Sequence, residues 1–291
     1  MKKLVTILLV MTLFLPVMTA QDVPEKELPA KMEELTAPQF SRAVEKSAKT
    51  CIIPLGVLEK HGPHLPLGTD VMVAREIARR AADTEYTIIF PYFYFGQIFE
   101  AKHQPGTLAY SNDLIWDVLQ ETCDELARNG IEKIILVNGH GGNNDLLPYF
   151  CQSQLAEAKD YSVVLFQPQT SSEVQEKAEE LRQTDIDMHA GEDETSMLHS
   201  FNPGVVHPEV ADSETGEDHE RLTDLPYGYT GIWWYGRFPQ HYAGDGSQPS
   251  DELGDLLLNH RAEQLVELIR YLKEDTSIEE LQQEFFDRTE Q

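Results

Sequence analysis

Short apolar runs alternate with amphipathic stretches of helical length along most of the chain. The expected strands are residues 50–58, 86–96, 131–139 and 161–168, and the expected helices are residues 40–49, 71–83, 114–130, 144–159 and 171–183. Short buried strands joined by helices of about ten or more residues are typical of βαβ units. The sequence therefore predicts an α/β fold with a mostly parallel sheet covered by helices on both faces.

The first twenty residues differ from the rest of the chain. Lys2 and Lys3 precede an apolar run, and the small residues Thr19 and Ala20 follow it. This order of charged, apolar and small segments is typical of a secretory signal peptide, and the run is short for a membrane span. We expect cleavage near Ala20 and an exported protein, periplasmic or extracellular, without stable membrane insertion. An uncleaved membrane anchor is the alternative.

The remaining chain divides into a leader, one domain and a tail. Residues 21–35 are polar with two prolines and predict a leader. Residues 36–275 form the expected single domain. Within it, residues 211–250 are rich in Gly, acidic and aromatic residues and predict an extended loop or insertion, and residues 253–275 predict a long helix. Residues 276–291 predict a helical tail.

The charge of the chain narrows the classes of partner. It carries 50 acidic against 23 basic residues, a formal net charge of -27. A negative field of this size repels nucleic acid and anionic lipid, so neither is an expected partner. The acidic residues are spread along the sequence, which indicates a solvated acidic surface. A high-salt habitat, where salt screens the self-repulsion, is one explanation.

The three cysteines do not suggest a disulfide framework. Cys51 opens an expected strand, and Cys123 and Cys151 lie on expected helices. They are too few and too scattered to staple a fold, so we expect buried free thiols.

Polar clusters follow two of the expected strands, where parallel sheets place their binding sites. The first, LEKHGPHLPLGTD, contains Glu59, His61 and Asp70. Two carboxylates and an imidazole bind metals such as zinc or manganese, and a carboxylate between two cations can bridge them. Taken alone, the stretch could also be a surface turn with incidental charges.

Two further clusters favour a metal site over a surface turn. NGHGGNN places His140 directly after an expected strand, where glycines let the backbone approach a ligand closely, although a packed or capping His is the alternative. MHAGEDETS adds His189, Glu192 and Glu194 at the start of an expected helix, where some acidic residues only complement the helix dipole. Together the three clusters favour a metal site.

Five motifs, taken in order, resemble the creatininase family of creatinine amidohydrolase-like metalloenzymes. They are LEKHGPHLPLGTD, HQPGT, NGHGGN, HAGEDETS and GDGSQPSDELG, and the resemblance runs from about residue 36 to about residue 272. It implies a single α/β domain, commonly assembled as a hexamer, so we expect a homo-oligomer. It also implies a dinuclear metal site that hydrolyses C–N bonds of small amides, often cyclic ones.

The resemblance also implies roles for individual residues. Glu59 and His140 would bind one metal, His61 would bind the other, and Asp70 would bridge the two. The ions would be zinc, manganese or both, with iron also open. His189 resembles the family's catalytic His, with Glu194 to orient it.

One ligand of the family is missing from its usual place. Creatininase itself has a Glu two residues after the His of the third strand, where this chain has Gly142. We expect Glu192 to replace that ligand, because it lies in the acidic motif expected to face the same crevice. Glu194 is the rival.

These charges predict a mechanism. Two bridged cations can lower the pKa of a bound water and present hydroxide to a carbonyl or amidine carbon, while the second metal polarises the substrate oxygen. The ordinary pKa of a histidine, about 6.5, suits proton transfer near neutral pH. We therefore expect His189 to pass a proton to the leaving nitrogen.

The substrate is less well defined than the reaction. Creatinine-specific members have a Trp shortly before the catalytic His, but LRQTDIDM contains no aromatic residue, and Gly141 replaces another aromatic. Trp233, Trp234 and Tyr235 could stack on a substrate, although packing or a subunit contact would also explain them. Three further histidines could line the entrance without an assigned role: His64, His103 and His241.

Two other functions stay open at this stage. A dinuclear site also serves phosphoester hydrolysis, but the first cluster offers only Lys60 to bind phosphate. A non-catalytic metal-binding protein with a degenerate site is favoured only by the altered fifth ligand. The leading expectation is an exported metal-dependent amidohydrolase that acts on a small-molecule amide.

Overall fold

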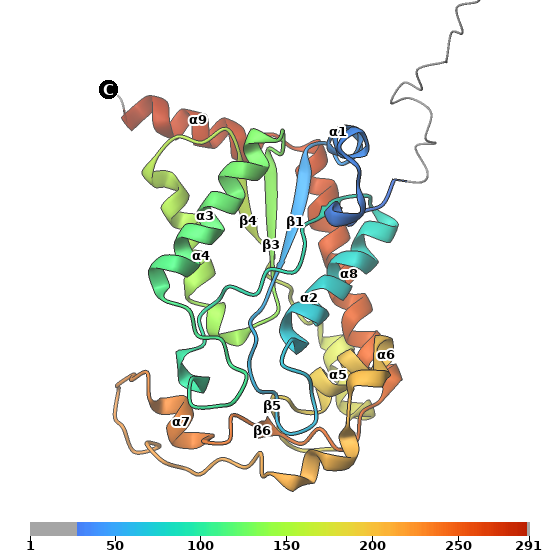
Figure 1. The fold of residues 1–291 in the computed structure, drawn as a ribbon, viewed down its shortest axis with the longest axis vertical. Helices are drawn as coiled ribbons and strands as arrows, with labels where there is room; N and C mark the ends of the chain where they lie inside the picture. The colour runs from blue at the N-terminus through green and yellow to red at the C-terminus, as the bar shows by residue number, and fades with distance from the viewer. Residues whose placement is uncertain (1–27, 290–291) are drawn as a thin grey trace, which may run out of the picture.

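A four-stranded parallel sheet forms the centre of the molecule (Figure 1). The structure is a computed structural model that describes residues 28–289, so the expected signal peptide lies outside the described residues. The strands, in the spatial order β2-β1-β3-β4, are β1 (Thr50–Leu55), β2 (Ile88–Ile89), β3 (Lys133–Asn138) and β4 (Ser162–Leu165). Every neighbouring pair is parallel, which confirms the predicted sheet.

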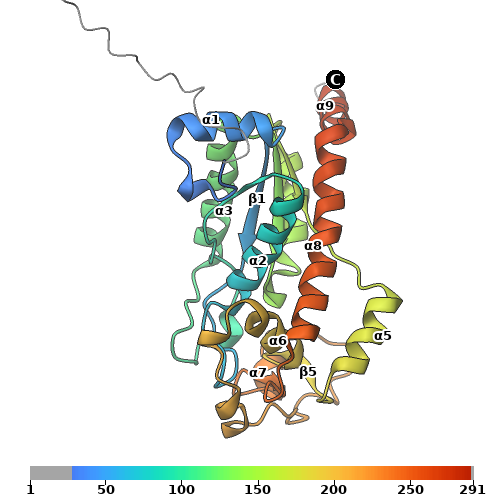
Figure 2. The same cartoon turned by 90° about the vertical axis from the view of Figure 1, so that its right-hand side faces the viewer.

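The helices cover both faces of this sheet. Within the described range they are α1 (Ala37–Lys46), α2 (Thr69–Thr84), α3 (Asn112–Arg128), α4 (Leu146–Ser153), α5 (Ser172–Leu181), α6 (Glu192–Phe201), α7 (Trp233–Arg237), α8 (Asp251–Glu274) and α9 (Ser277–Thr289). Helices α1, α3 and α4 pack on one face, and α2, α5, α6 and α8 pack on the other (Figure 2). The α/β architecture with helices on both faces is therefore as predicted.

Alternation along β1 explains why two cores form. Cys51, Ile53 and Leu55 are fully buried in the core under α1, α3 and α4. Ile52 points to the opposite face and packs with residues of α2 and α8. A strand buried on both faces reads as a continuous apolar run, which is how this segment appears in the sequence. The three cysteines are free thiols, as predicted, and only Cys151 is partly exposed.

Strand β2 is much shorter than the expected segment 86–96. Only Ile88–Ile89 pairs regularly with β1. Pro91 has no N–H to donate, and proline interrupts a ladder for that reason. Beyond it, Phe93 makes an isolated bridge to Leu55.

The first described residues pack on the domain. Leu28 is 7% exposed, and Lys31 forms a parallel bridge with Ile89 beside the sheet. Thr36 and Gln39 then form a capping box that starts α1. The expectation of a leader is therefore wrong for residues 28–35, because their apolar and backbone groups extend the core at the β2 edge.

An irregular region, made of residues 182–191 and 202–250 on either side of α6, covers one end of the sheet. It contains a small antiparallel pair, β5 (Asp187–His189) and β6 (Ala243–Gly244), which the sequence pattern did not predict. Much of residues 211–250 has no regular structure, as predicted, but α7 and β6 lie within it. Short 3-10 helices complete the chain: Met32–Glu34, Phe99–Ala101, Gly141–Asn143, Gln154–Ala156, Pro203–Val205 and Pro208–Ser213.

The two ends of the molecule differ in what they carry. Figure 1 places α9 at one end and α7, β5 and β6 at the other. Helix α9 occupies the residues expected to form a helical tail. None of the helices in residues 28–289 has both the length and the apolar character needed to cross a membrane.

Candidate metal centre

The polar clusters meet at the carboxyl ends of β1 and β3. Glu59 and His61 lie on the loop that leaves β1, Asp70 is in the first turn of α2, and His140 follows β3 by two residues. The start of α2 approaches both strand ends closely. A Cβ on Gly139 would lie 2.2 Å from the carbonyl oxygen of Asp70, so only glycine allows this packing. The loops therefore bring all four side chains to one edge of the sheet, as parallel topology predicts.

The first group of ligand atoms contains Glu59, Asp70 and His140. His140 Nδ1 lies 2.7 Å from Glu59 Oε1 and 3.2 Å from Asp70 Oδ2. The other ring nitrogen, Nε2, lies 2.7 Å from the carbonyl oxygen of Gln97 and donates to it. In the neutral ring this leaves an Nδ1 lone pair facing two carboxylates, and only a cation or a proton between them makes that arrangement favourable.

The second group contains His61, Asp70 and Glu194. His61 Nε2 lies 2.8 Å from Asp70 Oδ1, and its Nδ1 donates to the carbonyl oxygen of Glu59 at 3.3 Å. Burial lowers the pKa of His61, but the charge and hydrogen bond of Asp70 outweigh it and raise the pKa to about 10. The two oxygens of Asp70 thus point to different histidines, His61 and His140.

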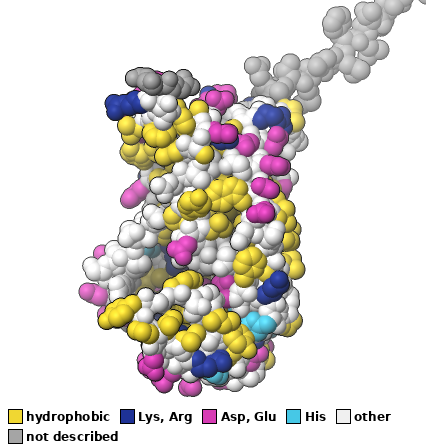
Figure 3. Space-filling view, turned by 90° about the vertical axis from the view of Figure 1, so that its left-hand side faces the viewer, with side chains coloured by type: hydrophobic (Ala, Val, Ile, Leu, Met, Phe, Trp, Pro, Cys, Tyr) yellow, Lys and Arg dark blue, Asp and Glu magenta, His cyan; other side chains and the backbone are white. Residues whose placement is uncertain are grey.

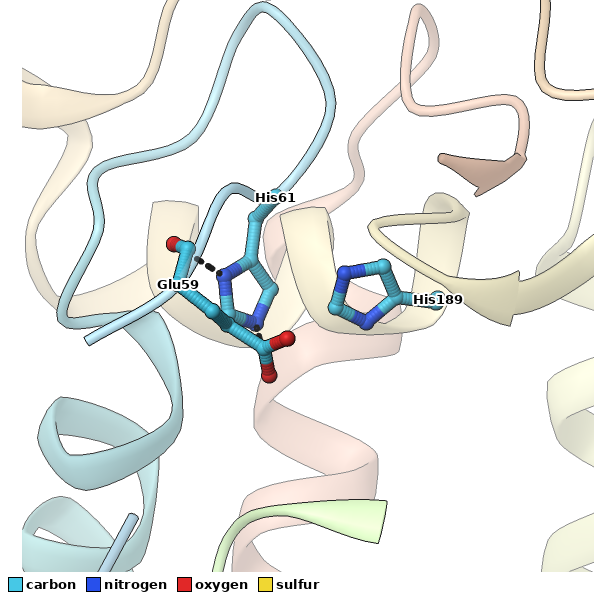
Figure 4. Close-up of side chains that lie close together, drawn as sticks. All are labelled: Glu59, His61 and His189. Atoms are coloured by element: carbon cyan, nitrogen blue, oxygen red, sulfur yellow. Dashed lines mark hydrogen bonds and ion pairs between the residues drawn. The ribbon is translucent and has the colours of Figure 1, made fainter. Parts of the chain in front are cut away.

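His189 lies beside His61 in the same centre. Their ring centroids are 4.5 Å apart, and the close-up shows the two imidazoles above the carboxylate of Glu59 (Figure 4). His189 Nε2 donates to the carbonyl oxygen of Lys60 at 3.0 Å, and Nδ1 lies 3.9 Å from Glu194 Oε2. The side chain of His189 is 12% exposed, so it lies nearer to solvent than the fully buried His61.

Burial and charge together test whether cations fit here. Glu59 is 0% exposed and Asp70 is 3% exposed, and across residues 28–289 the ion-pair partners found for both are histidines. Glu59 Oε1 is buried without a hydrogen-bond partner. Burial opposes the ionisation of Glu59, yet the charges of His140 and His189 hold its pKa well below its ordinary value. Buried carboxylates that face imidazole nitrogens fit divalent cations.

Comparison with known proteins agrees with this geometry. A family model described as "Creatininase: Creatinine amidohydrolase" matches residues 33–269. The chain belongs to the creatininase family. This confirms the resemblance drawn from the five motifs.

The relatives of the chain include hydrolases with different names. It is 26% identical over 209 residues to a creatinine amidohydrolase from Pseudomonas putida, across 67% of this chain and 78% of that protein. It is 28% identical over 173 residues to a mycofactocin precursor peptide peptidase from Mycolicibacterium smegmatis, across 57% of this chain and 63% of that peptidase. The match thus spans less than two thirds of the peptidase. These names support a hydrolase that acts on C–N bonds.

A solved structure extends the likeness to the fold. A mutant creatininase of the Zn-Zn type superposes with a TM-score of 0.69 at 22% identity, covering 83% of this chain and 97% of that chain. At this identity the likeness shows the fold alone.

Glu192 does not lie where the sequence led us to expect. Its carboxylate accepts hydrogen bonds from the backbone N–H groups of Gln183 and Thr184 and from the Thr184 hydroxyl, at 2.8 to 3.0 Å. The carboxylate of Glu192 therefore holds the preceding turn, and Glu192 belongs to none of the ligand groups found in the described residues, which disfavours its expected role as a ligand. Glu194, the rival, belongs to the second ligand group instead.

Gly142 has a structural reason to be glycine. A Cβ at this position would lie 2.4 Å from His140 Nε2 and 2.8 Å from the carbonyl oxygen of Gln97. These are the two atoms that form the hydrogen bond orienting His140. The Glu ligand that creatininase has at this position is thus missing here, and the structure leaves no space for a side chain in its place.

His241 is a residue of the centre to which the sequence assigned no role. It is 2% exposed, and its Nε2 contacts Glu59 Oε2. Trp234 Nε1 donates to His241 Nδ1 at 2.8 Å. Burial lowers the pKa of His241 to about 4, so the ring is neutral. The one available signal was its place three residues before the GDG motif.

The other two histidines set aside earlier have structural contacts. His64 Nε2 lies 2.9 Å from Thr195 Oγ1, and His103 Nε2 donates to the carbonyl oxygen of Pro239 at 2.8 Å. His64 and His103 therefore join the loops around the centre to α6 and to the irregular region.

Proposed function

We propose that the protein is a metal-dependent amidohydrolase that holds two divalent cations, zinc or manganese, and hydrolyses a C–N bond of a small amide. The observation that carries this proposal is the position of Asp70 between two ligand groups. Its Oδ1 lies 2.8 Å from His61 and its Oδ2 lies 3.2 Å from His140. A carboxylate shared in this way suits a bridge between two cations.

The ligand groups divide between the two ions. Glu59, Asp70 and His140 would hold one cation, and His61, Asp70 and Glu194 would hold the other. Bound there, the ions would supply Lewis acidity and lower the pKa of a water molecule. Glu194 takes the role left open by the glycine at position 142, which makes a degenerate, non-catalytic site the weaker candidate.

His189 is suited to move a proton at the open side of the centre. Because Nε2 donates to the Lys60 carbonyl, the neutral ring presents its Nδ1 lone pair toward Glu194 and the centre. Glu194 Oε2 is itself held by the backbone N–H of Ala190 at 2.6 Å. His189 Nδ1 can therefore take a proton from the nucleophile and deliver it to the leaving nitrogen, while the Lys60 carbonyl orients the ring and the charge of Glu194 favours its protonated form.

Trp234 of the irregular region lies beside His189. The ring centroids of Trp234 and His189 are 5.8 Å apart in an edge-to-face arrangement. Figure 3 shows hydrophobic side chains exposed on the end of the molecule that carries α7, as well as elsewhere on this face. Tyr227 and Tyr229 are fully or largely exposed in this region. A planar amide could stack on Trp234, whereas creatinine itself is not proposed because the aromatic residue before His189 is absent.

Phosphoester hydrolysis fits the centre less well. Lys60, the one basic residue of the first cluster, pairs with Glu214. A phosphate group would therefore meet carboxylates and imidazoles without a free cationic clamp from that loop.

Export and assembly complete the proposal. Residues 1–20 support secretion followed by cleavage near Ala20, and family membership supports a homo-oligomer. N-terminal sequencing of the protein recovered from periplasm or medium tests export, with a mature chain starting near residue 21 expected. An intact first segment on cytoplasmic protein would contradict it. Light scattering gives the assembly state, and a monomer would contradict the homo-oligomer.

One experiment tests the function as a whole. The metal content of the purified protein is measured, and hydrolysis of lactams, hydantoins, formamides and phosphate esters is then assayed with and without chelator. We expect bound zinc or manganese, hydrolysis of an amide, loss of activity with chelator and recovery with metal. The proposal would be overturned if the purified protein held no metal, if chelator left the hydrolysis unchanged, or if phosphate esters were the only substrates hydrolysed.

A further inference from the structure

A chain of three side chains runs from the irregular region into the metal centre. Trp234 Nε1 lies 2.8 Å from His241 Nδ1, and His241 Nε2 contacts Glu59 Oε2. Glu59 is 0% exposed and His241 is 2% exposed, so water does not compete for these hydrogen bonds. His241 thus links α7 to a ligand that precedes it by 182 residues.

The chemistry of the indole fixes the direction of this chain. An indole N–H can only donate, so His241 Nδ1 must accept from Trp234. The proton of the neutral imidazole is then on Nε2, which donates to Glu59 Oε2. Glu59 Oε1 is the oxygen left without a hydrogen bond, and it lies 2.7 Å from His140 Nδ1.

We propose that His241, held in one tautomer by Trp234, is a positioning residue that selects Oε1 of Glu59 as the metal-binding oxygen. The inference rests on the proposed function, because it assumes that cations bind in this centre. The terminal torsion of a Glu side chain is broad, so an unheld carboxylate exchanges its two oxygens readily. Hydrogen bonds behind a metal ligand remove this freedom and strengthen binding.

The backbone of His241 gives independent support. Its φ is 52°, in the left-handed region, where a residue with a side chain is held at a cost in energy. The segment just before His241 is also held at two points. Gln104 Nε2 donates to the carbonyl oxygen of Pro239 at 3.0 Å, and Arg237 pairs with Asp218. The surrounding structure therefore holds His241 in a conformation that brings its ring to Glu59.

Metal affinity tests the positioning role without any substrate. Zinc dissociation constants are measured by chelator competition for the wild-type protein, His241→Ala and His241→Gln. We expect His241→Ala to weaken binding roughly 10- to 100-fold. His241→Gln should restore most of the affinity, because its amide can still donate to Glu59. Circular dichroism of the metal-free proteins checks that each variant is folded.

Tryptophan fluorescence provides a second readout that does not require a change at His241. The chain has three tryptophans, and Trp233 is the matched control for Trp234. Glu59 is the hydrogen-bond partner of His241, so a cation bound to Glu59 alters the surroundings of Trp234. Zinc should therefore change the tryptophan emission of the wild-type protein and of Trp233→Phe. Trp234→Phe should lose most of this change and bind zinc several-fold more weakly.

The outcomes separate this inference from the proposed function. If the wild-type protein binds no divalent metal, the proposed function fails, and the positioning role fails with it. If the wild type binds zinc while folded His241→Ala or Trp234→Phe binds it equally well, only the positioning role is overturned. Weaker binding by both variants, with recovery in His241→Gln, supports it.

Discussion

The two halves of the metal centre are built in different ways. Glu59, His61 and His140 lie on the loops that leave β1 and β3, and Asp70 lies in the first turn of α2, inside the regular α/β layer. The opposite half, with Glu194 and His241, comes from α6 and an irregular region. In the first half, parallel strand pairing brings the ligands together, whereas tertiary packing alone does so in the second. In the proposed function, the regular half would supply most of the ligands, and the opposite half would add Glu194 and hold Glu59 through His241.

The largest effect is expected in the regular half, at Asp70. Asp70→Asn keeps the shape of the side chain but removes the charge shared by both ligand groups. Loss of a bound cation removes several kcal/mol of transition-state stabilisation, so hydrolysis should fall roughly a thousandfold or more. Metal analysis and steady-state rates on the best amide of the panel check this. An active Asp70→Asn variant with full metal content would remove Asp70 from its bridging role.

The next largest effect is expected at His189, which lies beside His61 where the two halves meet. His189→Ala should lower turnover roughly 10²- to 10⁴-fold, because proton transfer to the leaving nitrogen is lost. The metal content should stay at the wild-type level. Glu59, His61 and His189 also lie close enough to form a ligand group of their own. Loss of metal in His189→Ala would therefore reassign His189 from proton transfer to metal binding.

Substitutions of two glutamates of α6 should affect metal binding and folding stability differently. Glu194→Gln should weaken metal binding more than tenfold and change the free energy of unfolding by less than about 0.5 kcal/mol. Glu192→Gln should leave metal binding unchanged and lower the free energy of unfolding. It faces backbone donors at 2.8 to 3.0 Å, and disrupting them costs about 1–3 kcal/mol. Urea unfolding and metal titration of both variants measure the difference.

If Glu192→Gln loses metal while Glu194→Gln keeps it, the assignment of the two acids is wrong. Equal behaviour of the two variants in both measurements would contradict it as well.

The smallest effect is expected at the adjacent glycines after β3. Gly142→Ala would place a Cβ against His140 Nε2 and the Gln97 carbonyl, so it should cost about 1–3 kcal/mol of stability and weaken metal binding. Gly141→Ala is the matched control, because a Cβ there meets nothing within 4 Å. Thermal unfolding of both variants measures this. Equal stability of the two would show that the space around His140 is not limiting.

The sequence was sufficient for the regular half and only partly for the other. Apolar runs and glycine-rich loops locate the strand ends, so Glu59 and His140 could be placed together from the pattern alone. Glu192 and Glu194 could not be distinguished in that way. Residues two apart on a helix point about 200° apart, so only one of them can face the centre, and the phase of α6 is set by packing.

His241 was beyond the reach of pattern analysis for a related reason. It lies in a region without periodicity, 182 residues from Glu59, and its position depends on a left-handed backbone. Similarly, the end of β2 follows from Pro91, but the burial of Leu28 depends on a sheet edge that is formed by distant residues. Local composition carries no record of such contacts.

Anomalous diffraction from crystals grown with zinc tests the central claim most directly. We expect two zinc peaks, one on each side of Asp70: one at about 2.0–2.2 Å from Glu59 Oε1 and His140 Nδ1, and one at similar distances from His61 Nε2 and Glu194. Glu59 Oε2 should remain with His241. A map without zinc between Asp70 and these histidines, from protein that has bound zinc elsewhere, would contradict the account.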